Sequence, residues 1–167
     1  MLYLNFSKAD FDANTIVPTN DFEQAVKDFL IEWFSDSDIM IAHTSGSTGT
    51  PKEIILTKKN MRKSANMTAK YLHLQKGDTA LLAMPVNYIA GKLMLVRALE
   101  IGLKLICIQP TSHISLDEIN QSIQEELQSI DFIALTPMQV EKSLGFVAKC
   151  NKLIIGGAPL SDKVIQD

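Results

Sequence analysis

Apolar residues recur along this chain with two alternating spacings, and the alternation predicts the order of its secondary structure. In one kind of segment they lie three and four apart on one helical face, as Val26, Leu30 and Trp33 do. The other kind is a short apolar run, typical of a buried strand. The pattern predicts helices over residues 20–34, 57–77, 91–99, 116–127 and 136–145, and from Ser161 onward. It predicts strands over residues 39–42, 53–56, 80–83, 104–108, 132–135 and 153–155.

Polar residues and glycine support several of these boundaries. Asn20 and Glu23 have the spacing of a capping box, in which each side chain accepts a hydrogen bond from the other's backbone amide. Thr136 and Pro137 suit the N-cap and first position of a helix. Gly145 is expected to end that helix, because glycine readily adopts the left-handed conformation common after a last turn.

Strands that alternate with helices predict parallel pairing through helical crossovers. We therefore expect an α/β fold, with a mostly parallel β-sheet and helices on both faces, as a single domain over residues 1–167. Sheets of this kind bind ligands at the carboxyl ends of their strands. The chemistry is accordingly expected in the loops that follow Ala42, Ala83 and Ile155.

Composition narrows the class of protein. Of the 167 residues, 46% are hydrophobic and 21% are charged, which fits a globular domain and excludes a disordered one. The net charge of −3 argues against a nucleic-acid partner. Two cysteines form no disulfide framework, no apolar run approaches the length of a membrane span, and the N-terminus does not resemble a signal peptide. We expect a soluble, cytoplasmic protein without a membrane partner.

The loop between the second and third predicted elements carries the clearest chemical signal. From Thr44 to Gly49 every residue is Ser, Thr or Gly. Gly46 and Gly49 permit positive φ, so that backbone N–H groups can form an anion-binding nest, and Lys52 adds a positive charge. In the common nucleotide-binding phosphate loop the lysine leads directly into a helix, whereas here Lys52 leads into a predicted strand. A flexible Ser/Gly hairpin loop without a ligand is the alternative interpretation.

Residues 44–52, Thr-Ser-Gly-Ser-Thr-Gly-Thr-Pro-Lys, resemble the phosphate-loop signature of the adenylate-forming superfamily, which includes acyl-CoA synthetases. Two further segments follow in the order of that superfamily. Met84–Gly91 resembles its Pro-x-x-His-x-x-Gly acyl-pocket motif, and Ile155–Leu160 resembles its Gly-Gly-x-Pro segment. Lys92–Leu99 and Ala134–Gln139 are similar to the o-succinylbenzoate–CoA ligases of menaquinone biosynthesis.

The resemblance implies an acid–thiol ligase that converts a carboxylate with ATP to an acyl-adenylate and then to a CoA thioester. ATP, Mg²⁺, CoA and a small-molecule carboxylate are the implied cofactor, substrates and partners, and a homodimer is the expected assembly. Thr48 and Lys52 are the implied catalytic residues. The nucleotide would be held by Thr44, Ser45, Gly46, Ser47, Thr48, Gly49 and Lys52. The acid would be bound by Tyr88, Gly91, Arg97, Gly156, Gly157 and Ala158. No protein metal site is expected.

The chain also departs from the superfamily pattern. Tyr88 replaces the histidine of the acyl-pocket motif, and tyrosine donates a hydrogen bond but does not become a cation. The Tyr-Gly-x-Thr-Glu segment, the ribose-binding aspartate and the C-terminal lid domain with its lysine lie outside these 167 residues. We therefore expect an incomplete AMP-binding domain that is inactive alone. A non-catalytic ATP-binding or interaction module and another acyl-CoA synthetase remain the alternatives.

Arg97 and His43 each allow two interpretations. Arg97 interrupts an apolar helix, where it could pair with Glu100 or bind a substrate carboxylate, and Lys92 is a second candidate for that role. His43 ends a strand directly before the phosphate loop, where a structural role is favoured over a catalytic one. The six basic residues of segment 58–77 are expected to form a solvated helix face, with an anion-binding surface as the alternative.

Overall fold

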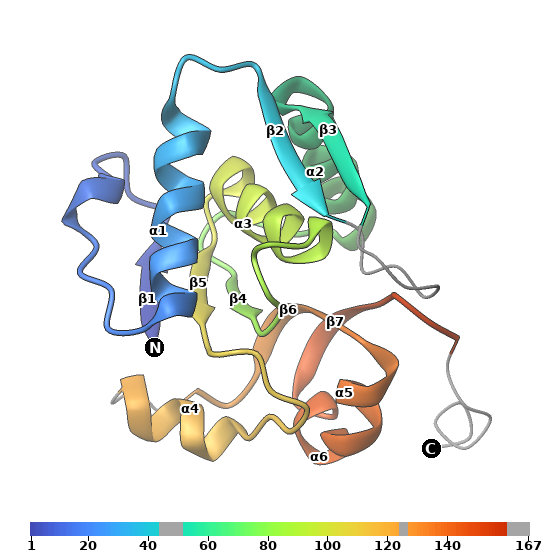
Figure 1. Ribbon diagram of the computed structural model, residues 1–167. Coiled ribbons are helices and arrows are strands. Elements are labelled where there is room, and N and C mark those ends of the chain that lie inside the picture. The colour runs from blue at the N-terminus through green and yellow to red at the C-terminus, as the bar shows by residue number, and fades with distance from the viewer. Residues whose placement is uncertain (44–51, 124–126, 160–167) are drawn as a thin grey trace.

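A five-stranded sheet forms the centre of the computed structural model, which describes residues 1–43, 52–123 and 127–159. Its strand order is β1-β5-β4-β6-β7 (Figure 1). The strands are β1 (Leu2–Asn5), β4 (Thr79–Leu82), β5 (Lys104–Cys107), β6 (Ile130–Leu135) and β7 (Cys150–Ile155). Only the edge strand β1 runs antiparallel to its neighbour, so the predicted mostly parallel α/β sheet is confirmed.

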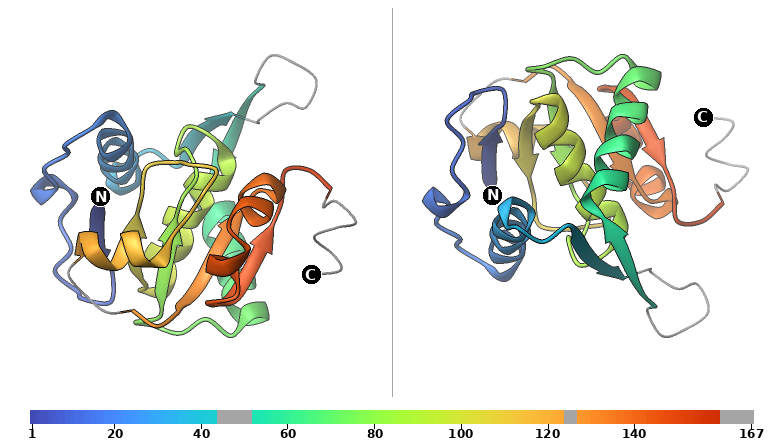
Figure 2. Two further views of the ribbon diagram at one scale, coloured as in Figure 1. Left: turned by 90° about the horizontal axis from the view of Figure 1, so that it is seen from below. Right: turned by 90° about the horizontal axis from the view of Figure 1, so that it is seen from above.

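Helices cover both faces of this sheet (Figure 2). They are α1 (Asp21–Phe34), α2 (Lys58–Leu72), α3 (Ile89–Ile101), α4 (Leu116–Ile123), α5 (Pro137–Lys142) and α6 (Leu144–Val147), with a short 3₁₀ turn η1 (Ala13–Thr15). Side chains of α1, α2 and α3 form one core with Leu82, and those of α4, α5 and α6 form another with Leu81. Because successive strand residues point to opposite faces, β4 contributes to both cores.

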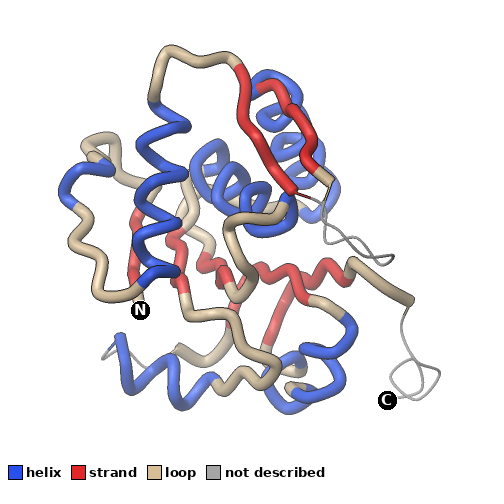
Figure 3. The backbone as a smooth tube through the Cα atoms, in the orientation of Figure 1, coloured by secondary structure: helices blue, strands red, loops and turns tan. Residues whose placement is uncertain are grey.

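Residues 39–42, expected as a buried strand, belong instead to a separate hairpin. β2 (Ile39–His43) pairs antiparallel with β3 (Glu53–Thr57) as a two-stranded sheet (Figure 3). A parallel return needs a crossover of about a dozen residues or more, and residues 44–52 are too few. Only one face of β2 is covered: Met40 is buried, whereas Ile39 and Ile41 are each 45% exposed.

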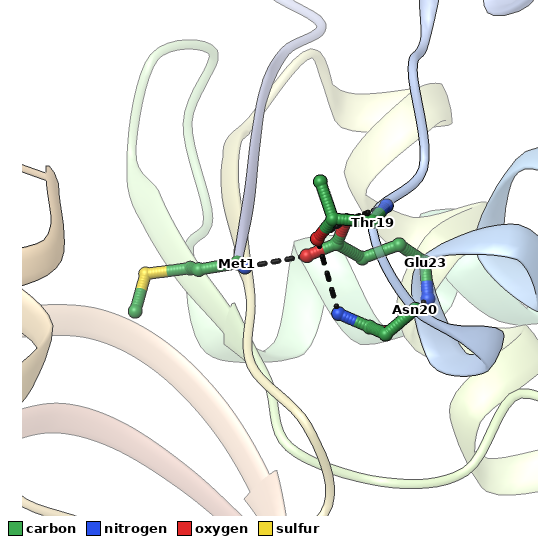
Figure 4. A network of polar contacts seen from close by, with 4 residues as sticks. All are labelled: Met1, Thr19, Asn20 and Glu23. Atoms are coloured by element: carbon green, nitrogen blue, oxygen red, sulfur yellow. Dashed lines mark hydrogen bonds and ion pairs between the residues drawn. The ribbon is translucent and has the colours of Figure 1, made fainter.

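Glu23 does not complete the expected capping box. Asn20 accepts a hydrogen bond from the amide of Glu23 at 3.0 Å and so caps α1 as predicted. The Glu23 carboxylate turns the other way, where it accepts from the Thr19 amide at 2.7 Å and pairs with the amino group of Met1 (Figure 4). The Met1 ammonium and the two donors of Thr19 take the place of the Asn20 amide, which a capping box would pair with this carboxylate. The salt bridge also connects the residue before β1 to α1.

Two helix ends differ from the predictions. Gly145 lies inside α6, because buried Ser143 ends α5 two residues earlier and its Oγ accepts a hydrogen bond from the Ile114 amide at 2.9 Å. α2 ends at Leu72, where His73 adopts the left-handed conformation (φ 51°), before Gly77 is reached. The helix predicted from Ser161 lies outside the described residues. In the described part of the chain, no helix has the length and apolar character that a membrane crossing requires.

Candidate functional site

The end of β2 is joined to the segment that enters α3. The backbone amide of His43 donates a hydrogen bond to the carbonyl oxygen of Asn87 at 3.3 Å. His43 and Tyr88 also form a parallel β-bridge. His43 is the residue directly before the phosphate-loop motif, so the described chain reaches that motif from a backbone held beside the acyl-pocket motif.

Gly91 allows the acyl-pocket motif to fold tightly onto the first turn of α3. A β-carbon at Gly91 would lie 2.3 Å from the carbonyl oxygen of Pro85, far inside van der Waals contact. The Tyr88 amide donates to that same oxygen at 3.4 Å, and the Tyr88 carbonyl accepts from the Lys92 amide at 3.1 Å. The glycine of the motif therefore serves the close approach of two backbone segments, next to Tyr88, which is the N-cap of α3.

Four polar side chains line one pocket of about 290 Å³ at this junction. They belong to His43, Asn87, Tyr88 and Lys92, and Ile41 supplies an apolar wall. Within the described ranges, none of the four side chains hydrogen-bonds to another residue. Polar groups that converge on a concavity without satisfying one another are typical of a ligand site.

Lys92 is the cation of this pocket and the most deeply buried of its polar residues. Only 8% of the residue is exposed, and its Nζ lies 5.1 Å from the centre of the Phe29 ring. Burial lowers the pKa of Lys92, although the negative charge of Glu32 opposes part of that effect. The environment therefore disfavours the ammonium, and an anion in the pocket would stabilise it.

Arg97 lies on α3 but does not line this pocket. Its Nε donates to Thr68 Oγ1 of α2 at 3.4 Å. Of its two interpretations, the pairing with Glu100 is wrong, because Glu100 Oε1 lies 3.3 Å from Nε of Arg62, which reaches it from α2. Burial lowers the pKa of Arg97, and no carboxylate of the described residues forms an ion pair with it.

A second concavity, of about 250 Å³, lies at the carboxyl ends of the central strands. Gln139 organises it: its Nε2 donates to the carbonyl oxygens of Ala83 and Thr111, both at 2.8 Å. Pro85 and Thr136 also line it. Ala83, one of the three strand ends after which the chemistry is expected, contributes to its lining.

The Gly-Gly segment follows β7 at the same edge. The Gly156 amide donates to the carbonyl oxygen of Leu135 at 3.1 Å, which prolongs the pairing of β7 with β6. Gly157 has φ 97°, a conformation that favours glycine. Gly156, Gly157 and Ala158 are exposed, and none of them lines the Tyr88 pocket.

The phosphate-loop prediction lies largely outside the described residues. Thr44, Ser45, Gly46, Ser47, Thr48 and Gly49 all fall in the range 44–51, which the structure does not describe. Lys52 is described, and it is exposed directly before β3. The described ranges contain no cluster of three or more His, Cys, Asp or Glu side chains that could hold a metal ion. ATP-bound Mg²⁺ needs no such cluster, because it commonly takes most of its ligands from phosphates and water.

Sequence reasoning missed Asn87 as a pocket residue and favoured only a structural role for His43. His43 was expected to have a structural role, yet its side chain lines the pocket as well. Asn87 occupies a variable position of the acyl-pocket motif, and no spacing rule singles it out. The position of His43 directly before a polar loop is a signal that could have found it, whereas no local signal marks Asn87.

Comparison with known proteins assigns the family. The model of the family described as AMP-binding enzyme matches residues 6–167. 2-Succinylbenzoate–CoA ligases from Enterococcus faecalis (29% identity) and Listeria monocytogenes (24%) align with 78% and 98% of this chain and with 27% and 32% of their own lengths. An acyl-CoA synthetase (AMP-forming)/AMP-acid ligase II-like protein from Dyadobacter fermentans superposes with a TM-score of 0.77 at 33% identity, over 92% of this chain and 44% of that one.

At 22% identity, the o-succinylbenzoate coenzyme A synthetase of Bacillus subtilis in complex with ATP and magnesium ion shares the fold with a TM-score of 0.59, over 75% of this chain and 26% of that one. The chain thus spans about a quarter to a third of the length of the curated relatives above. The family match covers nearly every residue, and the chain belongs to the AMP-binding enzyme family.

Proposed function

We propose that this chain supplies the phosphate-binding and acid-binding part of an ATP-dependent, AMP-forming acid–CoA ligase. One observation carries the proposal: the His43–Asn87 hydrogen bond holds the residue that precedes the phosphate-loop motif at a pocket of polar side chains that form no hydrogen bonds to one another. A ligase of this kind must hold a carboxylate next to ATP phosphates, and the position of His43 beside the acyl-pocket motif supports such an arrangement.

The proposed reaction has two steps. The carboxylate oxygen attacks the α-phosphorus of ATP, and pyrophosphate leaves as the acyl-adenylate forms. The thiolate sulfur of CoA then attacks the acyl carbon, and AMP leaves as the thioester forms. Positioning and neutralisation of the phosphate charge supply most of such catalysis. Mg²⁺ would neutralise phosphate charge when ATP is bound.

The chain's own residues have distinct proposed roles. The amides and hydroxyls of residues 44–49 hold the phosphates, and Thr48 and Lys52 contact them during adenylate formation. Tyr88 closes the acid pocket and donates a hydrogen bond, while Gly91 keeps it in place. Arg97 keeps a proposed role as a carboxylate-binding residue on the α2 side of α3, because no described carboxylate neutralises it. Gly156, Gly157 and Ala158 are proposed to border the acid from the sheet edge.

We propose 2-succinylbenzoate as the acid, because the relatives from E. faecalis and L. monocytogenes are ligases of that compound. A cytoplasmic location and a homodimer, both expected from the sequence, belong to the same proposal.

Product analysis tests this proposal. The gene product that contains these residues is incubated with ATP, Mg²⁺, CoA and 2-succinylbenzoate, and the nucleotides and thioesters are separated by chromatography. Acid-dependent formation of AMP and a CoA thioester is the expected result. Thioester formation only with other acids would support an acid–CoA ligase but contradict 2-succinylbenzoate as its substrate. Binding of ATP without any AMP would favour the non-catalytic module.

A further inference from the structure

Gln139 joins the segments that follow three strands of the central sheet through one buried side chain. Only 6% of the residue is exposed. Its Nε2 donates to the carbonyl oxygen of Ala83, directly after β4, and to that of Thr111, four residues after β5, both at 2.8 Å. Its Oε1 accepts from the amide of Thr136, directly after β6, at 3.1 Å and from the hydroxyl of Thr136 at 3.2 Å.

These four bonds use the whole hydrogen-bonding capacity of the amide. A glutamine side chain has two N–H donors and one oxygen that accepts two hydrogen bonds. Rotation of the amide by half a turn would set its oxygen against two carbonyl oxygens, so the partners also fix its orientation. A buried polar group whose bonds are all made within the protein stiffens its surroundings and has no donor left for a ligand. Gln139 is therefore suited to position other groups.

The bond to Ala83 acts on the segment that carries Tyr88. Ala83 is fully buried, and the acyl-pocket motif Met84–Gly91 begins at the next residue. Two residues after Ala83, the carbonyl oxygen of Pro85 accepts a hydrogen bond from the Tyr88 amide and lies against Gly91. The carbonyl that Gln139 holds is thus the start of a short chain of backbone contacts that reaches the N-cap of α3.

The same stretch of backbone separates the two concavities of the site. Pro85 lines the one that Gln139 organises, whereas Tyr88 lines the other. Without the Nε2 donors, the Ala83 carbonyl oxygen would lose its partner inside the protein, which costs free energy until the segment moves. Such a movement would displace the wall between the concavities, and Tyr88 with it.

We propose that Gln139 is a positioning residue for acid binding, which holds the acyl-pocket motif in place through its bonds to Ala83 and Thr111. The inference rests on the proposed function, and it assigns the role to a residue of α5 that lies outside that motif. Gln139 acts on the acid through Tyr88 and needs no contact with it, because its own bonds are all made within the protein.

Capping of α5 is a second role of the same side chain, and it can be separated from the first. The Gln139 oxygen completes the capping box with Thr136, whereas the nitrogen makes both bonds to distant segments. A glutamate at this position can also complete a capping box. Even when protonated, however, it donates to only one of the two carbonyls. Gln139→Glu therefore keeps the cap and breaks the connection, and Gln139→Met removes both.

The experiment compares these two variants with Asn120→Leu, a matched control on α4. Asn120 is also a side-chain amide bonded to the backbone: its Nδ2 donates to the Leu127 carbonyl oxygen at 3.0 Å, and its Oδ1 accepts from the Leu127 amide at 3.1 Å. It lines neither concavity. Acid-dependent exchange of pyrophosphate into ATP gives KM for 2-succinylbenzoate and for ATP. Hydrogen–deuterium exchange is followed in peptides that cover residues 84–92 and 21–34.

Both Gln139 variants should raise the KM for the acid roughly 5- to 100-fold, the effect of leaving buried carbonyls unpaired. The KM for ATP should change less than about threefold, because Gln139 forms no bond with the hairpin β2–β3 among the described residues. Residues 84–92 should exchange about tenfold faster or more, and residues 21–34 of α1 as in the wild type. Asn120→Leu should change neither KM nor the exchange of residues 84–92. If Gln139→Met does not fold, Gln139→Glu decides.

Wild-type KM and deuterium exchange in Gln139→Glu would overturn the inference, since capping of α5 would then be all that Gln139 provides. Equal acceleration of exchange in residues 84–92 and 21–34 would also overturn it, because Gln139 would then act through global stability. A wild type that exchanges no pyrophosphate would defeat the proposed function instead. Deuterium exchange would then decide alone: faster exchange of residues 84–92 in Gln139→Glu supports the positioning role, and unchanged exchange contradicts it.

Discussion

The backbone amide of His43 and the carbonyl oxygen of Asn87, 44 positions apart in the chain, are joined by a hydrogen bond of 3.3 Å. This contact connects the hairpin β2–β3 to the loop that begins α3. Both residues also line the polar pocket. A site built from two such segments depends on the backbone that holds them together.

Gly91→Ala should destabilise the protein by about 1–3 kcal/mol, because its new β-carbon would overlap the Pro85 carbonyl oxygen and force the motif apart. Thermal unfolding measures the loss of stability, and the KM for the acid measures the effect of the displaced motif on acid binding. Gly145→Ala is the matched control: it lies in α6 with no heavy atom within 4 Å of an added β-carbon, so that it should be neutral or slightly stabilising. Equal melting temperatures for the two variants would disprove the role of Gly91.

Arg97→Met should leave the free energy of unfolding unchanged or raise it by about 1–2 kcal/mol, since it removes a desolvated guanidinium that has no counter-charge among the described residues. Urea unfolding measures this directly. Thr68→Val removes the one recorded hydrogen-bond acceptor of Arg97 and serves as the control. If both variants lowered the stability by more than about 1 kcal/mol, Arg97 would be a structural link between α2 and α3.

Glu23→Gln should destabilise the protein at pH 7 and not at low pH. Burial alone would raise the pKa of Glu23, but hydrogen bonds from the Met1 ammonium and from Thr19 lower it from 4.5 to about 2. The folded state thus binds this proton more weakly than the unfolded state, and the stabilisation present above pH 4.5 is lost as the pH falls toward 2. We expect a difference of about 1–3 kcal/mol at pH 7.

Urea unfolding of the wild type and of Glu23→Gln at several pH values checks this. The gap between them should narrow from pH 4.5 downward, and a gap independent of pH would contradict the assigned pKa. Glu118→Gln, at an exposed position of α4, should change the stability at pH 7 by less than about 0.5 kcal/mol.

Local sequence signals predicted the elements of this fold well, because periodicity and capping act over a few residues. Thr136 and Gln139 form a complete capping box at the start of α5, with the proline at its first position. The same signals misplaced the end of that helix, since Ser143 breaks it through a bond to Ile114, 29 positions away. Distant partners of this kind leave no periodic trace in the sequence.

The site was predictable only in part for the same reason. The acyl-pocket motif located Tyr88, but the pairing of β2 with β3, and of His43 with Tyr88, depends on which segments meet in space. Lys92 looked like one of two cations on an apolar helix, and only its burial beside Tyr88 distinguishes it from Arg97.

The central claim, that residues 44–52 bind ATP phosphates for activation of an acid, is tested most directly by acid-dependent exchange of labelled pyrophosphate into ATP. The wild-type gene product is compared with Thr48→Ala and Lys52→Ala, and with Lys59→Ala as a control that removes an exposed lysine of α2. We predict that the first two variants lose exchange by roughly 10- to 1,000-fold, as when a positioned donor to a developing charge is removed, with unchanged circular dichroism, and that Lys59→Ala keeps it. Exchange at the wild-type rate in both Thr48→Ala and Lys52→Ala would contradict the account.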